Sequence, residues 1–289
     1  MKRASYGWEF IAPAALLIVT FVVLPCVWGI GMSFTHYDAI APARFAGVDN
    51  FRRLAGDPMV PLTLKRTALY VIYSLPTGLA LGLAIALALN ARWFKGRNFV
   101  RGLYFLPNVT SLAAVAFVWQ WLMNPEFGLL NAGLRRVGMS TLGWLSDPNL
   151  AMPSVALVGV WQGLGFTILI YLSGLRGIPE EVHEAAKIDG AGPWPTFRSV
   201  TWPLLMPTTM FLTIMGVIAG FQVFQSVYIM TGGGPLDATR VYLFYIFQSA
   251  FQNLEFGYAS AMAVLLFAIV MVLTGLQWAF YGRRLRTWQ

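Results

Sequence analysis

Amide and hydroxyl side chains interrupt the apolar runs of this sequence, and they are the groups best suited to bind a polar ligand there. Within these runs stand Asn108, Thr110, Ser111, Gln162, Thr167, Gln222 and Gln225. Each asparagine or glutamine offers both a hydrogen-bond donor and an acceptor, and aromatic neighbours such as Trp161 and Phe166 can stack on an apolar ring face. An alternative interpretation is that these amides join neighbouring helices. Because the set is polar but uncharged, it favours a neutral polar solute over an ion.

The ionisable residues argue against several other kinds of chemistry. The long apolar runs carry Asp, Glu, Lys, Arg and His only at their ends, whereas proton-coupled carriers usually need such a group inside the membrane. The two histidines, His36 and His183, fall in segments predicted on opposite sides of the membrane, so they cannot form a metal site or a catalytic pair. No phosphate-binding G-x-x-x-x-G-K-[ST] loop is present. We therefore expect no enzyme activity, no catalytic residue and no metal site in this chain.

The elements that position these residues are predicted to be membrane-spanning helices. Of the 289 residues, 57% are hydrophobic and only 11% are charged, about half the charged fraction of a soluble domain. Six apolar runs reach the roughly twenty residues that a spanning helix needs. The runs are residues 10–34, 67–89, 103–123, 153–175, 203–230 and 257–281. The sequence thus predicts an all-α polytopic membrane protein, with residues 1–289 forming a single transmembrane domain.

The first apolar run and the short apolar segment 241–252 each allow a second interpretation. The first run is too long for the hydrophobic region of a signal peptide, and further spans follow it, so we expect an uncleaved span. Residues 241–252 are aromatic and amphipathic but too short to cross, so we expect them at the membrane interface. The single cysteine, Cys26, lies in an apolar run and is expected to be a small core residue.

Lysine and arginine predict the orientation of the spans. If both termini are cytoplasmic, the inner segments hold twelve of these residues and the outer segments hold eight. The strongest signal is the short loop with Arg92, Lys95, Arg97 and Arg101 and no acidic residue. Both termini and the segment 179–207 are therefore expected in the cytoplasm. The net charge of +8 is explained by this orientation and does not require a nucleic-acid partner.

The polar stretch 179–207 contains a short amphipathic helix between the fourth and fifth runs. Pro179, Glu180 and Glu181 are typical of a helix start, and Gly190 is typical of a helix end. At 100° per residue, the apolar side consists of Val182, Ala185 and Ala186, and the charged side of Glu180, His183, Glu184 and Lys187. Such a helix needs a surface to lie on, which is either the lipid headgroup layer or another protein.

The same stretch resembles the EAA loop of bacterial ABC-importer permeases, E-A-A-x3-G-x9-I-x-L-P. The matching positions are Glu184, Ala185, Ala186, Gly190 and Pro203, and Val200 and Trp202 depart from the pattern. Further segments look like the carbohydrate-uptake branch, and within it like the first of the two permeases in maltose-, lactose- and glycerol-3-phosphate-type importers. These segments are residues 47–51, 106–107, 128–131, 178–179, 188–191, 231–235 and 257–261, together with Trp119.

The resemblance implies a function, partners and two sets of site residues. It implies one permease of an ATP-driven carbohydrate importer in the bacterial inner membrane, working with a second permease, a cytoplasmic ATPase dimer and an extracytoplasmic solute-binding protein. The chain itself would hold no cofactor, since ATP and Mg²⁺ would bind to the ATPase. The short helix would be the coupling helix that docks on the ATPase, with Glu181, Glu184, Ala185, Ala186, Asp189 and Gly190 as its contact residues.

Alignment to the family places the sugar pathway near the middle of the membrane. Its expected residues are Asn108, Ser111, Gln162, Gly163, Phe166, Gly220, Gln222 and Gln225, with Gly216 and Val223 nearby. Two other functions stay open at this point: an ATP-independent channel or facilitator for neutral polar solutes, and a structural membrane scaffold. The carried sugar, and whether it is phosphorylated, is likewise left open by the sequence.

Overall fold

The structure is a computed structural model that describes residues 5–91, 102, 104 and 106–286. The described residues are mostly helical, with one short antiparallel pair of strands, β1 (Thr35–His36) and β2 (Arg44–Phe45). The chain divides into two compact units. Unit 1 comprises residues 1–61 and 245–269, and unit 2 comprises residues 62–244 and 270–289. The basic residues Lys2, Arg3, Arg92, Lys95, Arg97 and Arg101, which support the predicted orientation, lie outside the described residues.

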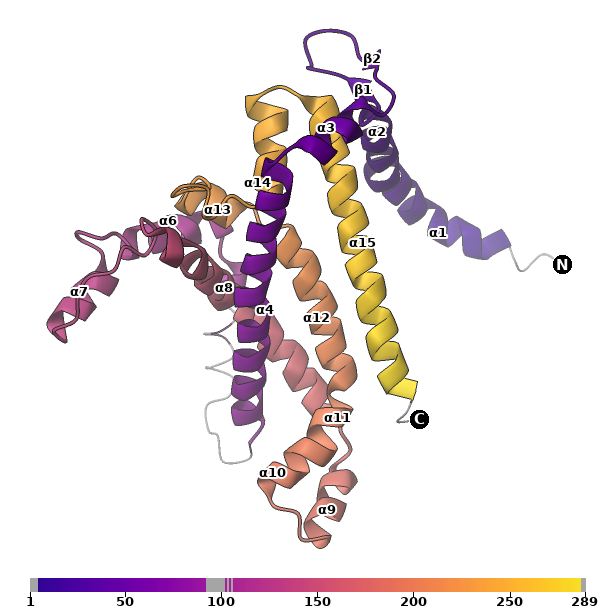
Figure 1. Cartoon of the computed structure of the whole chain (residues 1–289). Coiled ribbons are helices and arrows are strands. Elements are labelled where there is room, and N and C mark those ends of the chain that lie inside the picture. The colour runs from indigo at the N-terminus through magenta and orange to yellow at the C-terminus, as the bar shows by residue number, and fades with distance from the viewer. Residues whose placement is uncertain (1–4, 92–101, 103, 105, 287–289) are drawn as a thin grey trace. The chain divides into compact units, whose positions relative to one another are not determined.

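The prediction of a helical membrane protein is confirmed in its coarse form. Within the described residues, four helices are long and apolar enough to cross a membrane, and a bent helix pair raises the number to at most five. The first comprises α1 (Ser5–Ile18), η1 (Val19–Val23) and α2 (Leu24–Met32). The others are α4 (Met59–Asn90), α8 (Pro148–Arg176) and α15 (Phe256–Arg286) (Figure 1). The predicted number of six spans is therefore not reached by these helices.

The third predicted run, 103–123, is interrupted. Residues 106–109 are helical, the helix then stops, and α6 (Leu112–Leu122) begins after Ser111, whose ψ of 124° is extended. At 11 residues, α6 is too short to cross a bilayer by itself. The Thr110 hydroxyl bonds back to the Leu106 carbonyl at 2.9 Å. Serine and threonine lower hydropathy only slightly, so the apolar pattern did not indicate this break.

The fifth predicted run, 203–230, is divided at two places. A bend of 62° separates the segment of α10 (Pro193–Thr196), η2 (Phe197–Thr201) and α11 (Trp202–Leu204) from α12 (Met206–Phe221). Pro203 and Pro207 flank this bend, and neither has the N–H that would continue the helical hydrogen bonds across it. After α12 ends, Phe224 adopts φ −145°, and the chain starts α13 (Gln225–Met230).

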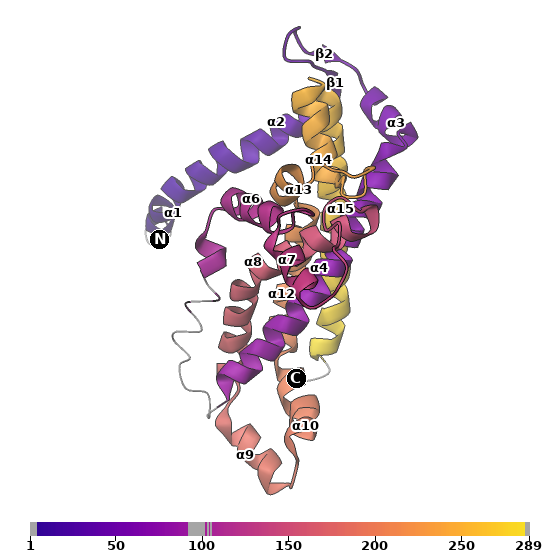
Figure 2. The same cartoon turned by 90° about the vertical axis from the view of Figure 1, so that its left-hand side faces the viewer.

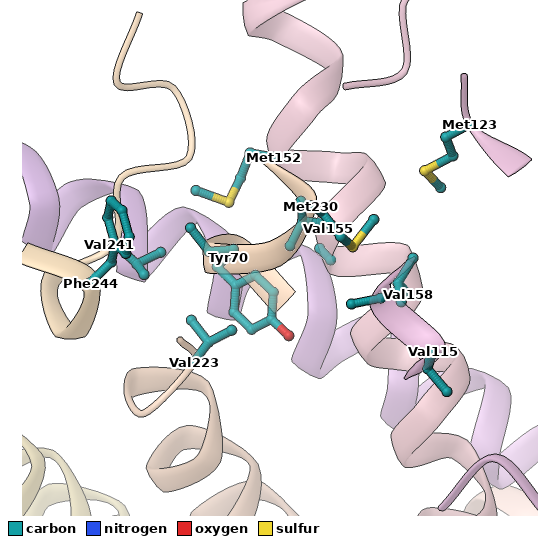
Figure 3. Close-up of a cluster of buried hydrophobic side chains, with 13 residues drawn as sticks. Tyr70, Val115, Met123, Met152, Val155, Val158, Val223, Met230, Val241 and Phe244 are labelled. Atoms are coloured by element: carbon teal, nitrogen blue, oxygen red, sulfur yellow. The ribbon is translucent and has the colours of Figure 1, made fainter. Parts of the chain in front are cut away.

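Unit 2 has two apolar clusters. In one of them, shown in Figure 3, Tyr70 of α4 lies among side chains that include Val155 and Val158 of α8 and Val223 and Met230 from the region of α13. The second cluster joins the later turns of α4 to α8 and α12 and includes Tyr171 and Leu205. The break after α12 is thus compensated because Val223 and, on α13, Ser226, Val227 and Met230 are buried.

The two ends of unit 2 carry different elements. In both views, α10 and α9 (Glu180–Ile188) lie at one end of this unit, and α6, α7 (Leu129–Arg136) and α13 lie near the other end (Figures 1 and 2). The short helix α9 is therefore separated from the loop around α7 by the length of α8. The placement of the two segments on opposite faces of the membrane stays a prediction.

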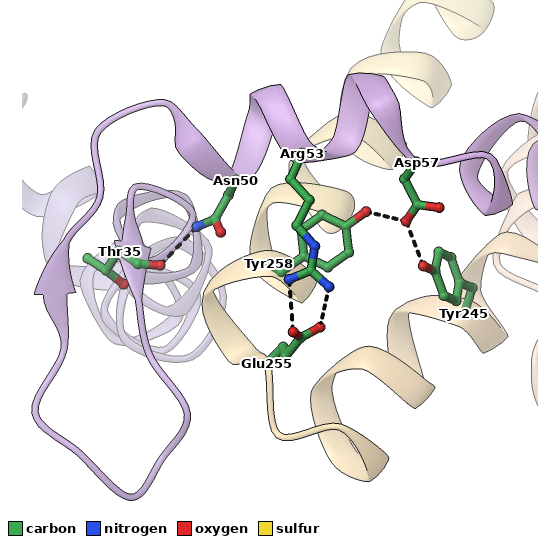
Figure 4. Close-up of polar contacts among 7 residues, drawn as sticks. All are labelled: Thr35, Asn50, Arg53, Asp57, Tyr245, Glu255 and Tyr258. Atoms are coloured by element: carbon green, nitrogen blue, oxygen red, sulfur yellow. Dashed lines mark hydrogen bonds and ion pairs between the residues drawn. The ribbon is translucent and has the colours of Figure 1, made fainter.

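Unit 1 is held together by polar contacts around α3 (Asp49–Gly56). Asn50 is buried, and its amide donates to the carbonyls of Ser33 and Thr35 at 2.9 Å each. Arg53 pairs with Glu255, and Asp57 accepts hydrogen bonds from Tyr245 and Tyr258 (Figure 4). Tyr245 lies in α14 (Tyr242–Phe247), which is followed by η3 (Gln248–Gln252). These contacts tie segments from the two ends of the sequence into one unit.

Candidate functional site

Unit 2 contains a cavity of about 310 Å³ bounded by α4, α8, α12 and the helical turn at residues 106–109. The lining residues lie at helical spacing, which places them on one face of each helix. The lining consists of Tyr70, Ser74, Leu75, Gly78, Leu79, Asn108, Gly159, Val160, Gly163, Phe166, Thr167, Leu212, Met215, Gly216, Ala219 and Gly220. A volume of this size can hold a small ligand.

Half of the expected pathway residues line this cavity. Asn108, Gly163, Phe166 and Gly220 are present in the lining, and so is Gly216. They come from three separate parts of the sequence, and the fold brings them to one place. The pathway role assigned to them stays a prediction.

The other four expected residues do not line the cavity. Gln162 lies on α8 next to Gly163, but a step of one residue turns the side chain by 100° away from the lining face. Ser111 precedes α6, Gln222 follows the last turn of α12, and Gln225 starts α13. These three stand where helices begin or end, and none of them borders the cavity.

The sequence analysis missed the contribution of α4. Tyr70, Ser74 and Gly78 recur every four residues, which places them on one face of α4 and in the cavity wall. Small residues at this spacing are typical of helix faces that pack closely in membranes. The four-residue spacing of Ser74 and Gly78 could have indicated this face of α4. Neither residue was among the expected pathway residues, because the polar ones among these were mainly amide side chains.

Among the described residues, the cavity lining contains no aspartate, glutamate, lysine, arginine or histidine. Two of its hydroxyls are already bonded to the backbone: Ser74 donates to the Tyr70 carbonyl at 2.8 Å, and Thr167 donates to the Gly163 carbonyl at 3.3 Å. The Asn108 amide and the Tyr70 hydroxyl are further polar groups of the lining. The cavity can therefore offer hydrogen bonds to a solute, but it offers no fixed charge.

Glycines set the width of this cavity. A Cβ at Gly220 would lie 2.7 Å from Cγ2 of Val71, and a Cβ at Gly216 would collide with Cδ1 of Leu75. A Cβ at Gly159 would likewise collide with the hydroxyl of Tyr70. The absence of these Cβ atoms lets α8 and α12 approach α4 closely.

The helix α9 ends as its sequence predicts. Gly190 has φ +75°, a conformation that glycine adopts easily, and the amides of Gly190 and Ala191 donate to the carbonyls of Lys187 and Ala186 at 3.0 and 2.9 Å. This pair of bonds is the Schellman motif, which satisfies the last carbonyls of a helix. It holds the turn after α9 in one conformation.

The expected coupling residues differ in exposure. Glu181, Glu184, Ala185, Asp189 and Gly190 are exposed. Ala186 is only 8% exposed, so it is covered by residues of its own chain. The exposed acidic residues can contact a partner protein, whereas Ala186 holds α9 on unit 2.

Unit 1 presents a second, charged cavity of about 370 Å³. Its described lining includes the acidic and basic residues His36, Asp38, Arg44, Arg53 and Glu255. The hydrogen bonds to Glu255 raise the pKa of Arg53. Arg53 also lies over the ring of Tyr258, 4.0 Å from its centroid. These residues belong to segments that the sequence predicts on the outer side of the membrane.

Next to this cavity, the Asp57 carboxylate accepts hydrogen bonds from Tyr245 at 2.6 Å and from Tyr258 at 2.5 Å. Partial burial by itself raises the pKa of Asp57. The hydrogen bonds from the two tyrosines and from the amide of Met59 outweigh this effect and hold the pKa below the usual 3.8. Burial, followed by the bond to Asp57, raises the pKa of Tyr245 to about 12. Asp57 is therefore ionised, and Tyr245 protonated, across the neutral range.

Comparison with known proteins identifies similar chains. A family model described as binding-protein-dependent transport system inner membrane component matches residues 78–287. The sn-glycerol-3-phosphate transport system permease protein UgpA of Agrobacterium fabrum is 34% identical over 280 residues, which cover 95% of this chain and 94% of that protein. The multiple sugar-binding transport system permease protein MsmF of Streptococcus mutans is 34% identical over 273 residues, which cover 94% of this chain and 93% of that protein.

A solved structure has a similar fold. It is the crystal structure of a bacterial alginate ABC transporter in complex with an alginate pentasaccharide-bound periplasmic protein. The matched chain has a TM-score of 0.85 and 23% sequence identity, and the match covers 98% of this chain and 96% of that chain. At this level of identity the likeness concerns the fold alone.

Proposed function

Because this chain belongs to the family of binding-protein-dependent transport system inner membrane components, we propose that it is the permease of an ATP-driven importer for a carbohydrate. In this proposal it forms half of the translocation pathway, and a second permease forms the other half. Residues 1–289 act as one transmembrane domain with six spans and with both termini in the cytoplasm. ATP hydrolysis takes place on a separate ATPase subunit, and an extracytoplasmic protein delivers the solute.

The observation that carries this proposal is the uncharged cavity at α4, α8 and α12. Its lining combines hydrogen-bonding groups such as Asn108 with the aromatic ring of Phe166 and with glycines, and the described part of this lining carries no charged side chain. A sugar presents hydroxyls around an apolar ring face, so it matches amide, hydroxyl and aromatic groups. The name of MsmF refers to multiple sugars and agrees with this class of solute, whereas the name of UgpA refers to the phosphorylated solute glycerol 3-phosphate. A phosphorylated solute would need a cation from outside this lining.

The short helix α9 supports the proposed coupling to an ATPase. It lies at one end of unit 2, it ends in a rigid Schellman turn, and Glu181, Glu184 and Asp189 are exposed on it. Exposed charges on a well-anchored helix suit docking on a partner protein, with Glu184 facing a cation or amide of the ATPase. An ATP-independent channel would not need this helix, and membership in an importer family does not favour a channel.

The proposal can be tested with the whole importer in proteoliposomes. The chain is co-expressed with the permease, ATPase and binding protein encoded beside it, and uptake of labelled maltose, raffinose and sn-glycerol 3-phosphate is measured. We expect ATP-dependent accumulation of at least one of these solutes. Glu184→Ala is expected to reduce both uptake and ATP hydrolysis stimulated by the binding protein. ATP-independent flux through the purified chain alone would contradict the proposed function.

A further inference from the structure

Tyr70 is the most deeply buried polar side chain that borders the cavity of unit 2. Its side chain is 7% exposed, and the neighbours labelled around it in Figure 3 are all apolar. The ring packs within the apolar cluster that includes Val155, Val158 and Val223. Its hydroxyl lies against the backbone of Gly159. If residue 159 had a side chain, its Cβ would collide with this hydroxyl. Gly159 thus leaves room for this hydroxyl at the cavity wall.

Within the described part of the chain, the Tyr70 hydroxyl makes no hydrogen bond. Its oxygen is not among the fully enclosed side-chain atoms that lack a partner, so it is not sealed off inside the protein. A buried phenol normally finds a hydrogen-bond partner, because leaving a buried donor unpaired costs free energy. Tyr70 and Gly159 both line the cavity, and the hydroxyl lies beside Gly159, so a molecule inside the cavity can reach it. A cavity of about 310 Å³ has room for water when it holds no solute, and a solute oxygen can replace that water.

Tyr171 provides an internal comparison. It is also buried, with 1% exposure, and it lies on α8, one of the helices that bound the cavity. Its hydroxyl donates to the Thr209 hydroxyl at 3.3 Å, and Tyr171 does not line the cavity. The Tyr171 hydroxyl therefore makes its hydrogen bond within the protein, whereas the Tyr70 hydroxyl can make one with a molecule that enters the cavity.

We propose that Tyr70 binds the transported solute and helps to determine its specificity, by donating a hydrogen bond from its hydroxyl to a hydroxyl or ring oxygen of a carbohydrate. This inference rests on the proposed import function and adds to it a residue of α4. A solute without an oxygen at that position leaves the buried phenol unpaired and is disfavoured. Gly159 is part of the same arrangement, because it makes the space in which the hydroxyl lies.

The test compares Tyr70→Phe with Tyr171→Phe in the proteoliposome importer, with maltose, raffinose and sn-glycerol 3-phosphate as probes. Uptake is measured at saturating binding protein, together with the number of solute molecules moved per ATP and the thermal unfolding midpoint. Tyr70→Phe removes no hydrogen bond that the described protein makes. We expect it to lower uptake and the solute-to-ATP ratio about tenfold and to leave the midpoint unchanged.

Tyr171→Phe is expected to give the opposite result: a lower midpoint and unchanged uptake per folded transporter. If Tyr70→Phe transports like the wild type, or if its loss of uptake comes with a matching loss of thermal stability, the assignment of Tyr70 is overturned while the import function stands. If the wild-type importer shows neither ATP-dependent uptake of a probe nor ATP hydrolysis stimulated by the binding protein, the import function itself is overturned, and this inference with it.

Discussion

The guanidinium of Arg53 donates two parallel hydrogen bonds, each 2.8 Å long, to the two carboxylate oxygens of Glu255, which lies 202 positions later in the chain. The same guanidinium lies over the ring of Tyr258. Both charged side chains are partly exposed, at 53% and 37%. This bidentate ion pair links α3 to the residue that precedes α15 within unit 1.

Loss of this pair is expected to weaken unit 1 modestly. Because both partners are partly solvated, we expect a coupling free energy of about 0.5–1 kcal/mol between Arg53 and Glu255. A double-mutant cycle with Arg53→Met and Glu255→Gln, followed by thermal unfolding in detergent, measures it. Arg53→Lys should recover only part of the coupling, since lysine cannot make the parallel bonds. A coupling of zero would mean that the pair contributes no net stability.

The Asp57 contacts predict a defined pH dependence. The folded pKa of Asp57 lies below 3.8, so its stabilising bonds are fully present above that pH and are lost as the pH falls through the folded value. The pKa of Tyr245 is raised to about 12, so its proton is retained throughout the neutral range. The difference in thermal midpoint between the wild type and Asp57→Asn should therefore stay constant from about pH 5 to pH 9 and shrink below about pH 4. A change in this difference near pH 6 or 7 would contradict the assignment.

The glycines of α12 predict where a single methyl group will disturb the packing. Gly220→Ala places a Cβ against Val71, and Gly216→Ala places one against Leu75. We expect each change to lower the free energy of unfolding by about 1–3 kcal/mol through overpacking. Gly275→Ala is the matched control, because no atom lies within 4 Å of its added Cβ, and it should be neutral or slightly stabilising. Equal effects at all three positions would argue against close helix approach as the cause.

The turn after α9 predicts a backbone effect on coupling. Gly190 has φ +75°, so Gly190→Val should strain the Schellman turn, whereas Gly190→Asn should be tolerated far better. If α9 docks on an ATPase, the valine variant should reduce ATP hydrolysis stimulated by the binding protein by about tenfold or more, given a strain of roughly 1–3 kcal/mol. The asparagine variant should stay within about twofold of the wild type. Unchanged coupling with valine would show that the shape of this turn is not needed.

Some features could be predicted from the sequence because they depend on local interactions. Helix α9 starts and stops where Pro179 and Gly190 predict, since caps and positive-φ turns involve only neighbouring residues. The apolar runs around α4, α8 and α15 also predicted long helices, because a bilayer requires each segment to satisfy its own backbone hydrogen bonds. The predicted continuity of the third and fifth runs was wrong, because buried side chains stabilise short helices that hydropathy alone cannot separate from spans.

The sequence by itself determined the class of protein, its family resemblance and the uncharged character of its apolar runs. Only the tertiary structure decided which residues face the cavity: Gly163 but not the adjacent Gln162, and Tyr70, which no motif had indicated. It also decided that Arg53 meets Glu255 and that Ala186 is covered by its own chain. The physical reason is that side-chain direction and close helix approach depend on contacts between distant segments. Such contacts exist only once the helices have packed together.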